Sequence, residues 1–411
     1  MSTKFKNIHI LYMSIGDSPS LKTIADLIGD IAPHSMSEMY GINFGGGSSS
    51  PASGTISLSV FRNQVIQLTP TEWLEQAKIM ASDGQGGSKG LGDRFGNSVS
   101  ISGDGNTAIV GSWLEDTGGT DAGAAYIFIR SGTSWSEQAK IQASDKVAYD
   151  NFGESVAISG DGNTVIVGVR AKEGYTGAAY IFTRSGTSWS EQAKIQALDT
   201  VASDNFGQSV AISIDGNTAI IGAPAKDGNW TGAAYIFTRS GTSWSEQAKI
   251  QASDKEADDE FGYSVSISSD GNTAIVGSWL EDTGGTNAGA AYIFIRSGTS
   301  WSEQAKIQAS DKALDDNFGK SVSISGDGNT AIVGSWLEDT GGTNAGAVYI
   351  FTRSGTSWSE QVKIQASDKA LDDNFGKSVA ISSNGNTAIV GAEFEDTMGI
   401  DAGAAYILAF T

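Results

Sequence analysis

The feature that most constrains the fold is an internal repeat that fills most of the 411 residues. A Phe-Gly pair recurs with steps of 57, 54, 55, 57 and 57 residues, at Phe95, Phe152, Phe206, Phe261, Phe318 and Phe375. A second marker, W-x-E-Q-[AV]-K, recurs at Trp73, Trp135, Trp189, Trp244, Trp301 and Trp358. Residues 105–146 and 271–312 differ only at Asp121 against Asn287. Each unit therefore solves the same packing problem.

One unit contains four expected strands, at residues 98–102, 107–111, 124–130 and 135–143. The first two are joined by Gly103-Asp104-Gly105-Asn106, a hairpin signal because these residues tolerate positive φ. The third strand is apolar on both faces, which predicts burial on both sides. The fourth alternates apolar and polar residues, so it suits an outer strand with one wet face.

Four antiparallel strands at this repeat length predict the blades of a β-propeller. The repeat region opens with a fourth strand at Trp73 and ends with a third strand at residues 406–410. We therefore predict an all-β, six-bladed propeller with interlocked closure, in which residues 73–79 supply the outer strand of the blade that begins at Phe375. An open solenoid is the alternative, but it would normally carry atypical polar caps, and neither end of the repeat region shows one.

Phe-Gly, a hairpin and then Gly-Ala-Pro in one register resemble the FG-GAP repeat of integrin α-chain propellers and their microbial relatives. Gly222-Ala223-Pro224 matches the second half literally. The other units depart from it, at Gly111-Ser112-Trp113, Gly168-Val169-Arg170, Gly277-Ser278-Trp279, Gly334-Ser335-Trp336 and Gly391-Ala392-Glu393. The resemblance spans residues 71–411 and implies a propeller used for binding. Integrin propellers have seven blades, so six is a departure.

Composition excludes several classes of function. The chain has 26 basic and 47 acidic residues and a formal net charge of −21, which argues against nucleic acid and anionic membrane surfaces as partners. No apolar run approaches the ~20 residues of a membrane span, so we expect no membrane insertion. Cysteine is absent and His9 and His34 are the only histidines, which excludes thiol chemistry and a histidine triad or zinc cluster in the repeats.

Residues 1–70 form a separate region whose charges cancel. Asp17-Ser18-Pro19-Ser20 before an apolar-periodic stretch predicts a capped amphipathic helix, and residues 45–51 read as a flexible linker. Two phrases at 34–41 and 55–63 share S-[ML]-S-x-[MF], which is similar to short segments of virion and tail proteins of tailed bacteriophages. That resemblance implies an anchoring segment bound to virion or other assembly proteins. A small capping or oligomerising segment is the alternative, and homo-oligomerisation stays open.

The turns and loops fall on two faces of the expected propeller. Loops between the second and third strands, and between the fourth strand and the next unit, are longer and more variable, so we place ligand binding there. The candidate ligand-binding residues are Trp113, Glu115, Asp116, Tyr175, Trp230, Trp279, Glu281, Asp282, Trp336, Glu338, Asp339, Phe394, Glu395 and Asp396. Aromatic rings beside carboxylates suit sugars. The alternative is that the tryptophans pack between blades and the acids are merely solvated.

We expect no cofactor. Integrin-type units bind calcium through D-x-[DN]-x-D-G in the first hairpin, where several oxygens converge. Here the hairpin holds one acid, at Asp104, Asp161, Asp215, Asp270 and Asp327, with Asn384 in the last unit. The ligands therefore do not carry over, and these residues are expected to form turns. Low-affinity calcium among the acidic long loops stays open.

We also expect no enzyme. Sialidase chemistry needs arginines over the axis, whereas the recurrent Arg130, Arg184, Arg239, Arg296 and Arg353 lie at turns on the other face. Near-identical units give equivalent sites, and catalysis needs one asymmetric constellation. A carboxylate pair for glycoside hydrolysis would have to come from different blades.

The leading hypothesis is a non-enzymatic virion protein of a phage tail or fibre, or another surface protein. Its propeller would bind a host-surface receptor, either glycan or protein, and six similar weak sites would give avidity. Its expected location is the virion tail, with an extracellular or cell-surface location as the alternative. Two other functions stay open, namely a structural decoration or spacer without a soluble ligand, and a secreted bacterial adhesin.

Overall fold

The structure, a computed structural model, describes residues 76–83, 92–396 and 402–409. The chain divides into two units, Met1–Leu74 and Glu75–Thr411, and all described residues belong to the second. The anchoring segment expected at residues 1–70 and the start of the expected closing strand, Trp73, lie outside the described residues. Within the described ranges no helix has the length and apolar character needed to span a membrane.

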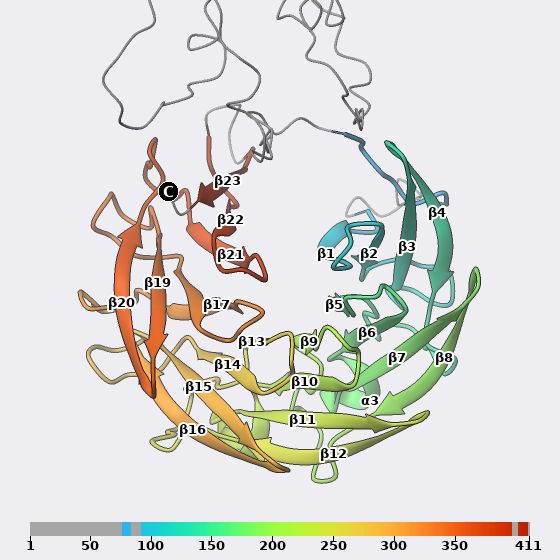
Figure 1. The fold of residues 1–411 in the computed structure, drawn as a ribbon, viewed down its shortest axis with the longest axis horizontal. Helices are drawn as coiled ribbons and strands as arrows, with labels where there is room; N and C mark the ends of the chain where they lie inside the picture. Colours follow the sequence, from blue (N-terminus) through green and yellow to red (C-terminus); the bar gives the residue numbers. More distant parts are fainter. Residues whose placement is uncertain (1–75, 84–91, 397–401, 410–411) are drawn as a thin grey trace, which may run out of the picture. The chain divides into compact units, whose positions relative to one another are not determined.

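The described residues form 23 strands in six antiparallel sheets around one axis (Figure 1). The first three sheets hold β1 (Phe95–Ile101), β2 (Thr107–Ser112), β3 (Ala124–Ser131), β4 (Ser134–Ile141); β5 (Ser155–Ile158), β6 (Thr164–Val169), β7 (Ala178–Ser185), β8 (Ser188–Ile195); β9 (Val210–Ile212), β10 (Thr218–Ala223), β11 (Ala233–Ser240), β12 (Ser243–Ile250). The other three hold β13 (Ser264–Ile267), β14 (Thr273–Ser278), β15 (Ala290–Ser297), β16 (Ser300–Ile307); β17 (Phe318–Ile324), β18 (Thr330–Ser335), β19 (Ala347–Ser354), β20 (Ser357–Ile364); β21 (Phe375–Ile381), β22 (Thr387–Ala392), β23 (Ala404–Ala409). The prediction of a six-bladed propeller is confirmed.

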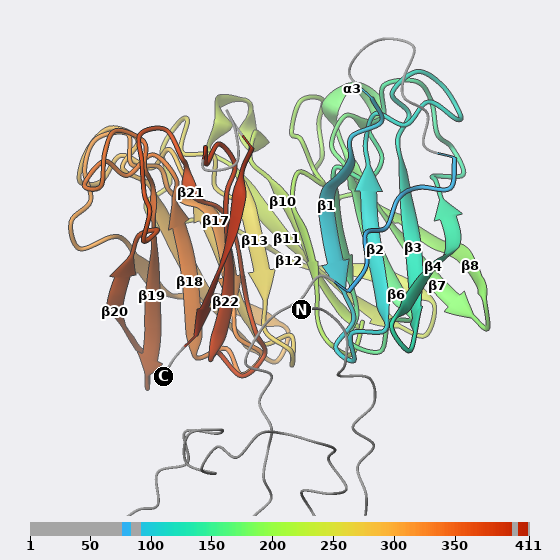
Figure 2. The ribbon, with the colours of Figure 1, turned by 90° about the horizontal axis from the view of Figure 1, so that it is seen from above.

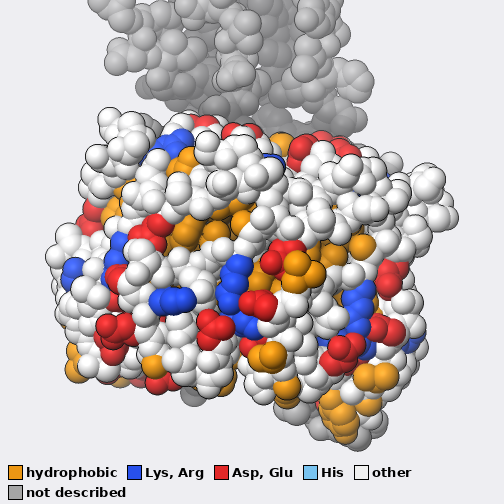
Figure 3. All heavy atoms as spheres, turned by 90° about the horizontal axis from the view of Figure 1, so that it is seen from below, with side chains coloured by type: hydrophobic (Ala, Val, Ile, Leu, Met, Phe, Trp, Pro, Cys, Tyr) orange, Lys and Arg blue, Asp and Glu red, His pale blue; other side chains and the backbone are white. Residues whose placement is uncertain are grey.

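Within each sheet the strands follow chain order, with the first strand innermost and the fourth outermost (Figure 1). The third strand is buried along most of its length, as in β3, β7 and β11. The fourth strand is less buried: in β4, Ser134 and Ser136 are exposed and most of the other residues are half-buried. Figure 3 shows one side of the molecule, where basic and acidic side chains lie beside one another.

The Phe-Gly marker builds the junction between neighbouring blades. Phe152 is fully buried and packs on Tyr180 and Phe182 of its own blade, at ring-centroid distances of 5.8 and 6.0 Å. Its backbone forms a bridge to Gly123 of the preceding blade, where a Cβ would lie 2.2 Å from the Phe152 carbonyl oxygen. Only glycine fits such a close approach. The same bridge recurs at Gly177, Gly232, Gly289 and Gly346.

The tryptophan marker ties the outer strands together. Each complete fourth strand has a β-bulge at its glutamine, for example at Gln138 in β4, and a bulge re-aims the local side chain. Trp189 Nε1 of the next blade donates to Gln138 Oε1 at 2.9 Å. The same bond joins Trp244 to Gln192, Trp301 to Gln247 and Trp358 to Gln304, each at 3.0 Å, and Trp135 to Gln76 at 3.3 Å.

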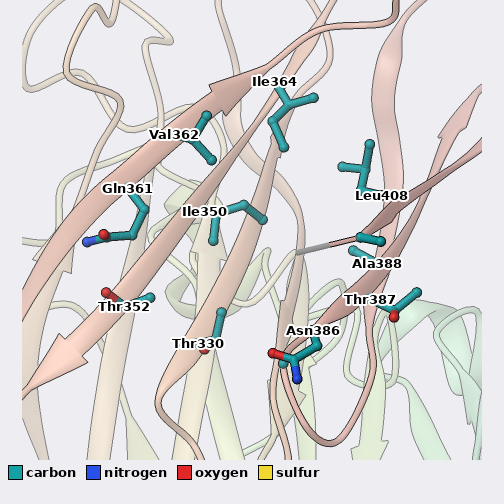
Figure 4. Close-up of a pocket in the computed structure, with 12 residues that line it drawn as sticks. Thr330, Ile350, Thr352, Gln361, Val362, Ile364, Asn386, Thr387, Ala388 and Leu408 are labelled. Carbon is teal, nitrogen blue, oxygen red and sulfur yellow. The ribbon is translucent and has the colours of Figure 1, made fainter. Parts of the chain in front are cut away.

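The sixth blade differs, because its sheet has three described strands. Residues 76–79 are not in a strand, but Ile79 and Ala81 pack on the first blade as the equivalent residues do at other junctions. A cavity of about 510 Å³ lies between the fifth and sixth blades, and Figure 4 shows Val362, Ile364 and Leu408 around it. Pairing of residues 73–79 with β23 stays a prediction.

Candidate functional site

The long loops meet at one end of the ring, which we call the long-loop face. It carries the loops between the second and third strands of each blade and those from the fourth strand to the next blade. Figure 2 shows this end at the top, marked by α3 (Lys172–Tyr175) in the second blade; η2 (Lys226–Trp230) is its counterpart in the third. The innermost strands begin at this face, so residues after each Phe-Gly pair lie there near the axis.

The predicted glutamates of this face are buried rather than free for a ligand. Glu281 is 4% exposed, and its carboxylate accepts from Lys306 Nζ at 2.7 Å, Gln308 Nε2 at 2.9 Å and the Thr283 N–H at 2.9 Å. Glu115 and Glu338 make the same three kinds of contact in their own blades. Glu395 is 6% exposed. Three of the four carboxylates therefore hold their blades together.

The neighbouring aspartates close their own loops. Asp116, Asp282 and Asp339 are exposed, and each accepts the N–H five residues further on, from Asp121, Asn287 and Asn344 respectively, at 2.8 Å. Asp396 is also exposed. These contacts form loops within single blades, so the structure does not gather the predicted Glu-Asp pairs into one site. Whether they contact a ligand stays a prediction.

The predicted aromatic residues divide into two sets. Trp113, Trp279 and Trp336 are half-buried, and the buried Nε1 atoms of Trp113 and Trp336 have no hydrogen-bond partner among the residues that the structure describes. Tyr175, Trp230 and Phe394 are 48%, 44% and 38% exposed. Tyr175 and Trp230 have positive φ values of 63° and 59°, an uncommon conformation for bulky residues.

Two of these tryptophans belong to a pocket where the innermost strands begin, which we call the axial pocket. It has a volume of about 250 Å³ and draws on the second to fifth blades. Its lining residues are Glu154, Arg170, Asn205, Gln208, Pro224, Trp230, Glu260, Tyr263, Trp279 and Lys320. Four different blades thus supply different side chains to one place, which breaks the repeat symmetry.

Most charges of the axial pocket have partners. Arg170 Nε lies 2.6 Å from Glu154 Oε2, and Trp279 Nε1 donates to Glu260 Oε2 at 2.7 Å. Burial raises the pKa of both carboxyls. Lys320 differs, because its Nζ lies over two rings, 3.5 Å from the Trp279 centroid and 3.9 Å from that of Tyr263. Burial, with repulsion from Lys377, lowers the pKa of Lys320 to about 7.

Sequence reasoning missed most of this pocket, although a signal was present. The residue after each Phe-Gly pair changes in nearly every unit, reading Asn97, Glu154, Gln208, Tyr263, Lys320 and Lys377. The residue that follows each second strand varies likewise, reading Trp113, Arg170, Pro224, Trp279, Trp336 and Glu393. Both positions vary between units that are otherwise nearly identical, and one directly follows the constant Phe-Gly pair. This variation could have predicted a site to which each blade contributes a different side chain.

The opposite face is built from turns, as the sequence predicts. Asp161 accepts from Ser159 Oγ at 2.6 Å and from the Asn163 N–H at 2.9 Å, and Asn384 accepts similarly from Ser382 Oγ at 2.7 Å. Arg184 Nε donates to Asn163 Oδ1 at 2.9 Å, and Arg130, Arg239 and Arg353 make the same contact, so these arginines stabilise the turns. In the part of the chain that the structure describes, no three His, Cys, Asp or Glu side chains are grouped to hold a metal ion.

Comparison with known proteins identifies the family. The model described as FG-GAP repeat matches residues 73–128, 135–182, 189–237, 244–294, 301–351 and 358–408, which is more than half of the sequence. The chain therefore belongs to the FG-GAP repeat family. From the second segment onward, each match runs from the tryptophan of an outer strand to the third strand of the next sheet.

The structural comparison supports the fold alone. The solved structure of Kuenenia stuttgartiensis Hydrazine Synthase resembles this chain with a TM-score of 0.50 and 15% sequence identity, over 78% of each chain. That protein is an enzyme by its name, but a likeness at this identity carries no function across. No curated protein matches the chain. The similarity of residues 1–70 to bacteriophage proteins stays a prediction.

Proposed function

We propose that this chain is a non-enzymatic binding protein whose long-loop face engages a receptor, glycan or protein, on a host cell surface. Residues 1–70 would anchor it to a virion tail or another surface assembly. An FG-GAP propeller is consistent with a binding or adhesion role. The virion part of the proposal depends on the resemblance of residues 1–70 and on nothing in the described propeller.

The observation that carries the proposal is the axial pocket. It joins an exposed ring, Trp230, to amide side chains, Gln208 and Asn205, and to charged groups from neighbouring blades. These residues lie in loops that the rigid sheets hold in place, which is the usual arrangement of a binding site on a repetitive scaffold. Polar groups that converge beside aromatic rings give a pocket both affinity and orientation.

The pocket supports binding better than catalysis. Its two carboxylates each have a partner, since Glu154 pairs with Arg170 and Glu260 accepts from Trp279. A glycosidase pair would need one carboxyl free to donate a proton and the other free to attack or to activate water. We therefore keep the non-enzymatic assignment as part of the proposal.

A structural spacer is the second candidate. Three predicted ligand-binding residues, Glu115, Glu281 and Glu338, favour this function. Each is buried and paired with a lysine of its own blade, so it has a structural role there. A spacer would leave the axial pocket without a ligand.

The test is binding of the labelled full-length chain to a panel of bacterial cells and to a glycan array. Trp230→Ala should reduce binding about tenfold or more, since exposed aromatic residues in pockets are frequent hot spots. Thr242→Ala, in an exposed turn of the same blade on the opposite face, is the matched control and should change nothing. Folded protein that binds neither cells nor glycans would sink the proposal and favour the spacer.

A further inference from the structure

We infer that the axial pocket binds a sugar that carries a carboxylate, and that Lys320 is the residue that receives this carboxylate. The inference rests on the proposed function, because it names the ligand class of the same site. It starts from the one cation of the pocket that the described residues leave without an anion.

Lys320 lies near the aromatic rings of three residues. Its Nζ is 3.5 Å from the Trp279 centroid, 3.9 Å from that of Tyr263 and 5.6 Å from that of Trp336. Among the described residues no ion pair is formed by Lys320, whereas Arg170 pairs with Glu154 and Lys377 with Glu393 at 3.4 Å. Cation–π contacts of this kind offset only part of the cost of removing an ammonium from water.

The charged neighbours of Lys320 do not replace that anion. Glu260 attracts it but lies beyond ion-pair distance, with one oxygen bonded to Trp279 Nε1. Lys377, whose Nζ lies 3.6 Å from the Trp336 centroid, repels it. Glu154 and Arg170, which also line the pocket, form an ion pair that is neutral as a whole. An incoming anion would offset both the free-energy cost of removing the Lys320 ammonium from water and its repulsion by Lys377.

The remaining lining favours a sugar ring as the carrier of the anion. The volume of about 250 Å³ lies below the usual range for drug-sized ligands, so it suits one ring rather than an oligosaccharide. Trp230 offers an exposed ring to the CH face of a sugar. Gln208, which is partly exposed, supplies an amide donor and acceptor for hydroxyl groups, and the buried Asn205 lines the pocket near it.

The experiment compares matched glycans on the full-length chain. The probes are glycans that end in glucuronic acid, the same glycans ending in glucose, and a form with sulfated terminal glucose. Wild type should prefer the glucuronic acid form about tenfold, because one charge-assisted hydrogen bond supplies roughly that factor. Lys320→Met should lose the preference, and Lys320→Arg should keep it. Lys255→Met, an exposed lysine bonded to Gln251, is the control and should behave as wild type.

A pH series separates charge recognition from shape. Because the pKa of Lys320 is lowered to about 7, this lysine is charged at pH 6 and mostly neutral at pH 8.5. The acid preference of wild type should therefore fall roughly tenfold between these values. Lys320→Arg stays charged throughout and should keep its preference.

The outcomes separate this inference from the proposed function. Equal binding of acidic and neutral probes, an unchanged preference in Lys320→Met, or stronger binding of the sulfated probe would each overturn the assignment of a carboxylate. Absence of glycan binding would do the same. Cell binding that is lost in Trp230→Ala and kept in Lys320→Met would leave the proposed function standing while this inference fails.

Discussion

The second and third blades differ from the fourth and fifth at one buried position, although the rest of their architecture is shared. In the second and third, Lys172 and Lys226 lie in the loop after the second strand, and each Nζ is 2.8 Å from a buried aspartate, Asp150 or Asp204. The matching residues of the fourth and fifth blades are Glu281 and Glu338. The same aspartate position there is filled by Asp259 and Asp316, both buried.

This difference shows that one backbone tolerates two charge patterns. Burial first, with repulsion from Glu281 and Glu338, raises the pKa of Asp259 and Asp316 to about 6. Two blades thus pair the buried carboxylate with an ammonium, while in two others the carboxyl has a raised pKa and takes up its proton at a higher pH than usual. Stability should therefore depend on pH in the fourth and fifth blades more than in the second and third.

The largest expected effect comes from removing a buried lysine. Lys226→Met leaves Asp204, which is 1% exposed, without its cation. Breaking a buried pair from one side should cost about 3–5 kcal/mol of unfolding free energy. Denaturant unfolding at pH 7.5 measures it, and exposed Lys255→Met should stay within about 0.5 kcal/mol of wild type. A loss below about 1 kcal/mol would show that the pair does not hold the third blade.

The next prediction concerns the junction between the sixth and first blades. A disulfide cross-link can test whether residues 73–79 pair with β23. In the fourth blade Ile293 lies opposite Ala305; the matching residues for closure are Ile407 and Ala77. The chain has no native cysteine, so Ala77→Cys with Ile407→Cys should give one intramolecular disulfide and add about 2–4 kcal/mol of stability. Non-reducing electrophoresis and unfolding measure both.

The control pair is Ala77→Cys with Ile214→Cys, which has no matching contact in the other blades and should remain reduced. Cross-linked dimers in place of the intramolecular bond would contradict interlocked closure. They would show that the edge strand β23 (Ala404–Ala409) pairs between chains.

A smaller effect, but one of diagnostic sign, is expected at the two aspartates whose pKa values are raised. The pKa of Asp316 is about 6 in the folded state, against about 3.9 unfolded. Its stabilising contribution is therefore complete below pH ~4 and is lost as the pH rises through about 6. Asp316→Asn should raise the unfolding free energy at pH 8 by about 1–2 kcal/mol, with the gain shrinking as the pH falls from 6 towards 4.

The third blade supplies the matched control for that substitution. Asp204→Asn removes the anion of a buried lysine pair, so it should destabilise at pH 8 instead of stabilising. Urea unfolding at pH 4, 6 and 8 tests both variants. The same sign at Asp204 and Asp316 would mean that the two charge patterns are not distinct in energy.

The fold could be predicted from the sequence because hydrophobic alternation and repeat spacing are local. The buried third strands and the Asp161 turn needed no knowledge of neighbours. The bulge at Gln138 could not be predicted, since alternation does not show where an extra residue enters. The bulge allows Gln138 to accept a hydrogen bond from Trp189 of the next blade, and these two residues are 51 positions apart in the sequence.

The candidate site was harder to predict because side-chain direction depends on tertiary contacts. Glu281 and Asp282 are adjacent in sequence, yet the first is buried on Lys306 and the second is exposed. From the composition of the loop alone, Glu281 and Asp282 were both predicted to bind a ligand. Lys320 was missed because a single lysine after Phe-Gly carries no chemistry until Tyr263 and Trp279 of the preceding blade surround it.

The smallest expected effect concerns a contact that both kinds of blade share. Tyr235 Oη donates to Asp199 Oδ1 at 2.7 Å in the third blade, and Tyr292 Oη to Asp254 Oδ1 at 2.8 Å in the fourth. Burial, and then the aspartate, raises the pKa of both tyrosines. Each Tyr→Phe change should cost about 1 kcal/mol, since the acceptors are half-exposed and keep other partners.

Because the contact is common, the two losses should agree within about 0.5 kcal/mol. The acceptors differ only in their lysines: Asp199 faces Lys226 and Lys249, whereas Asp254 pairs with Lys306. A clearly larger loss in Tyr292→Phe, measured by urea unfolding at pH 7.5, would show that the second lysine of the third blade compensates for the missing hydroxyl. The difference between the blades would then extend beyond the buried aspartate to the whole junction.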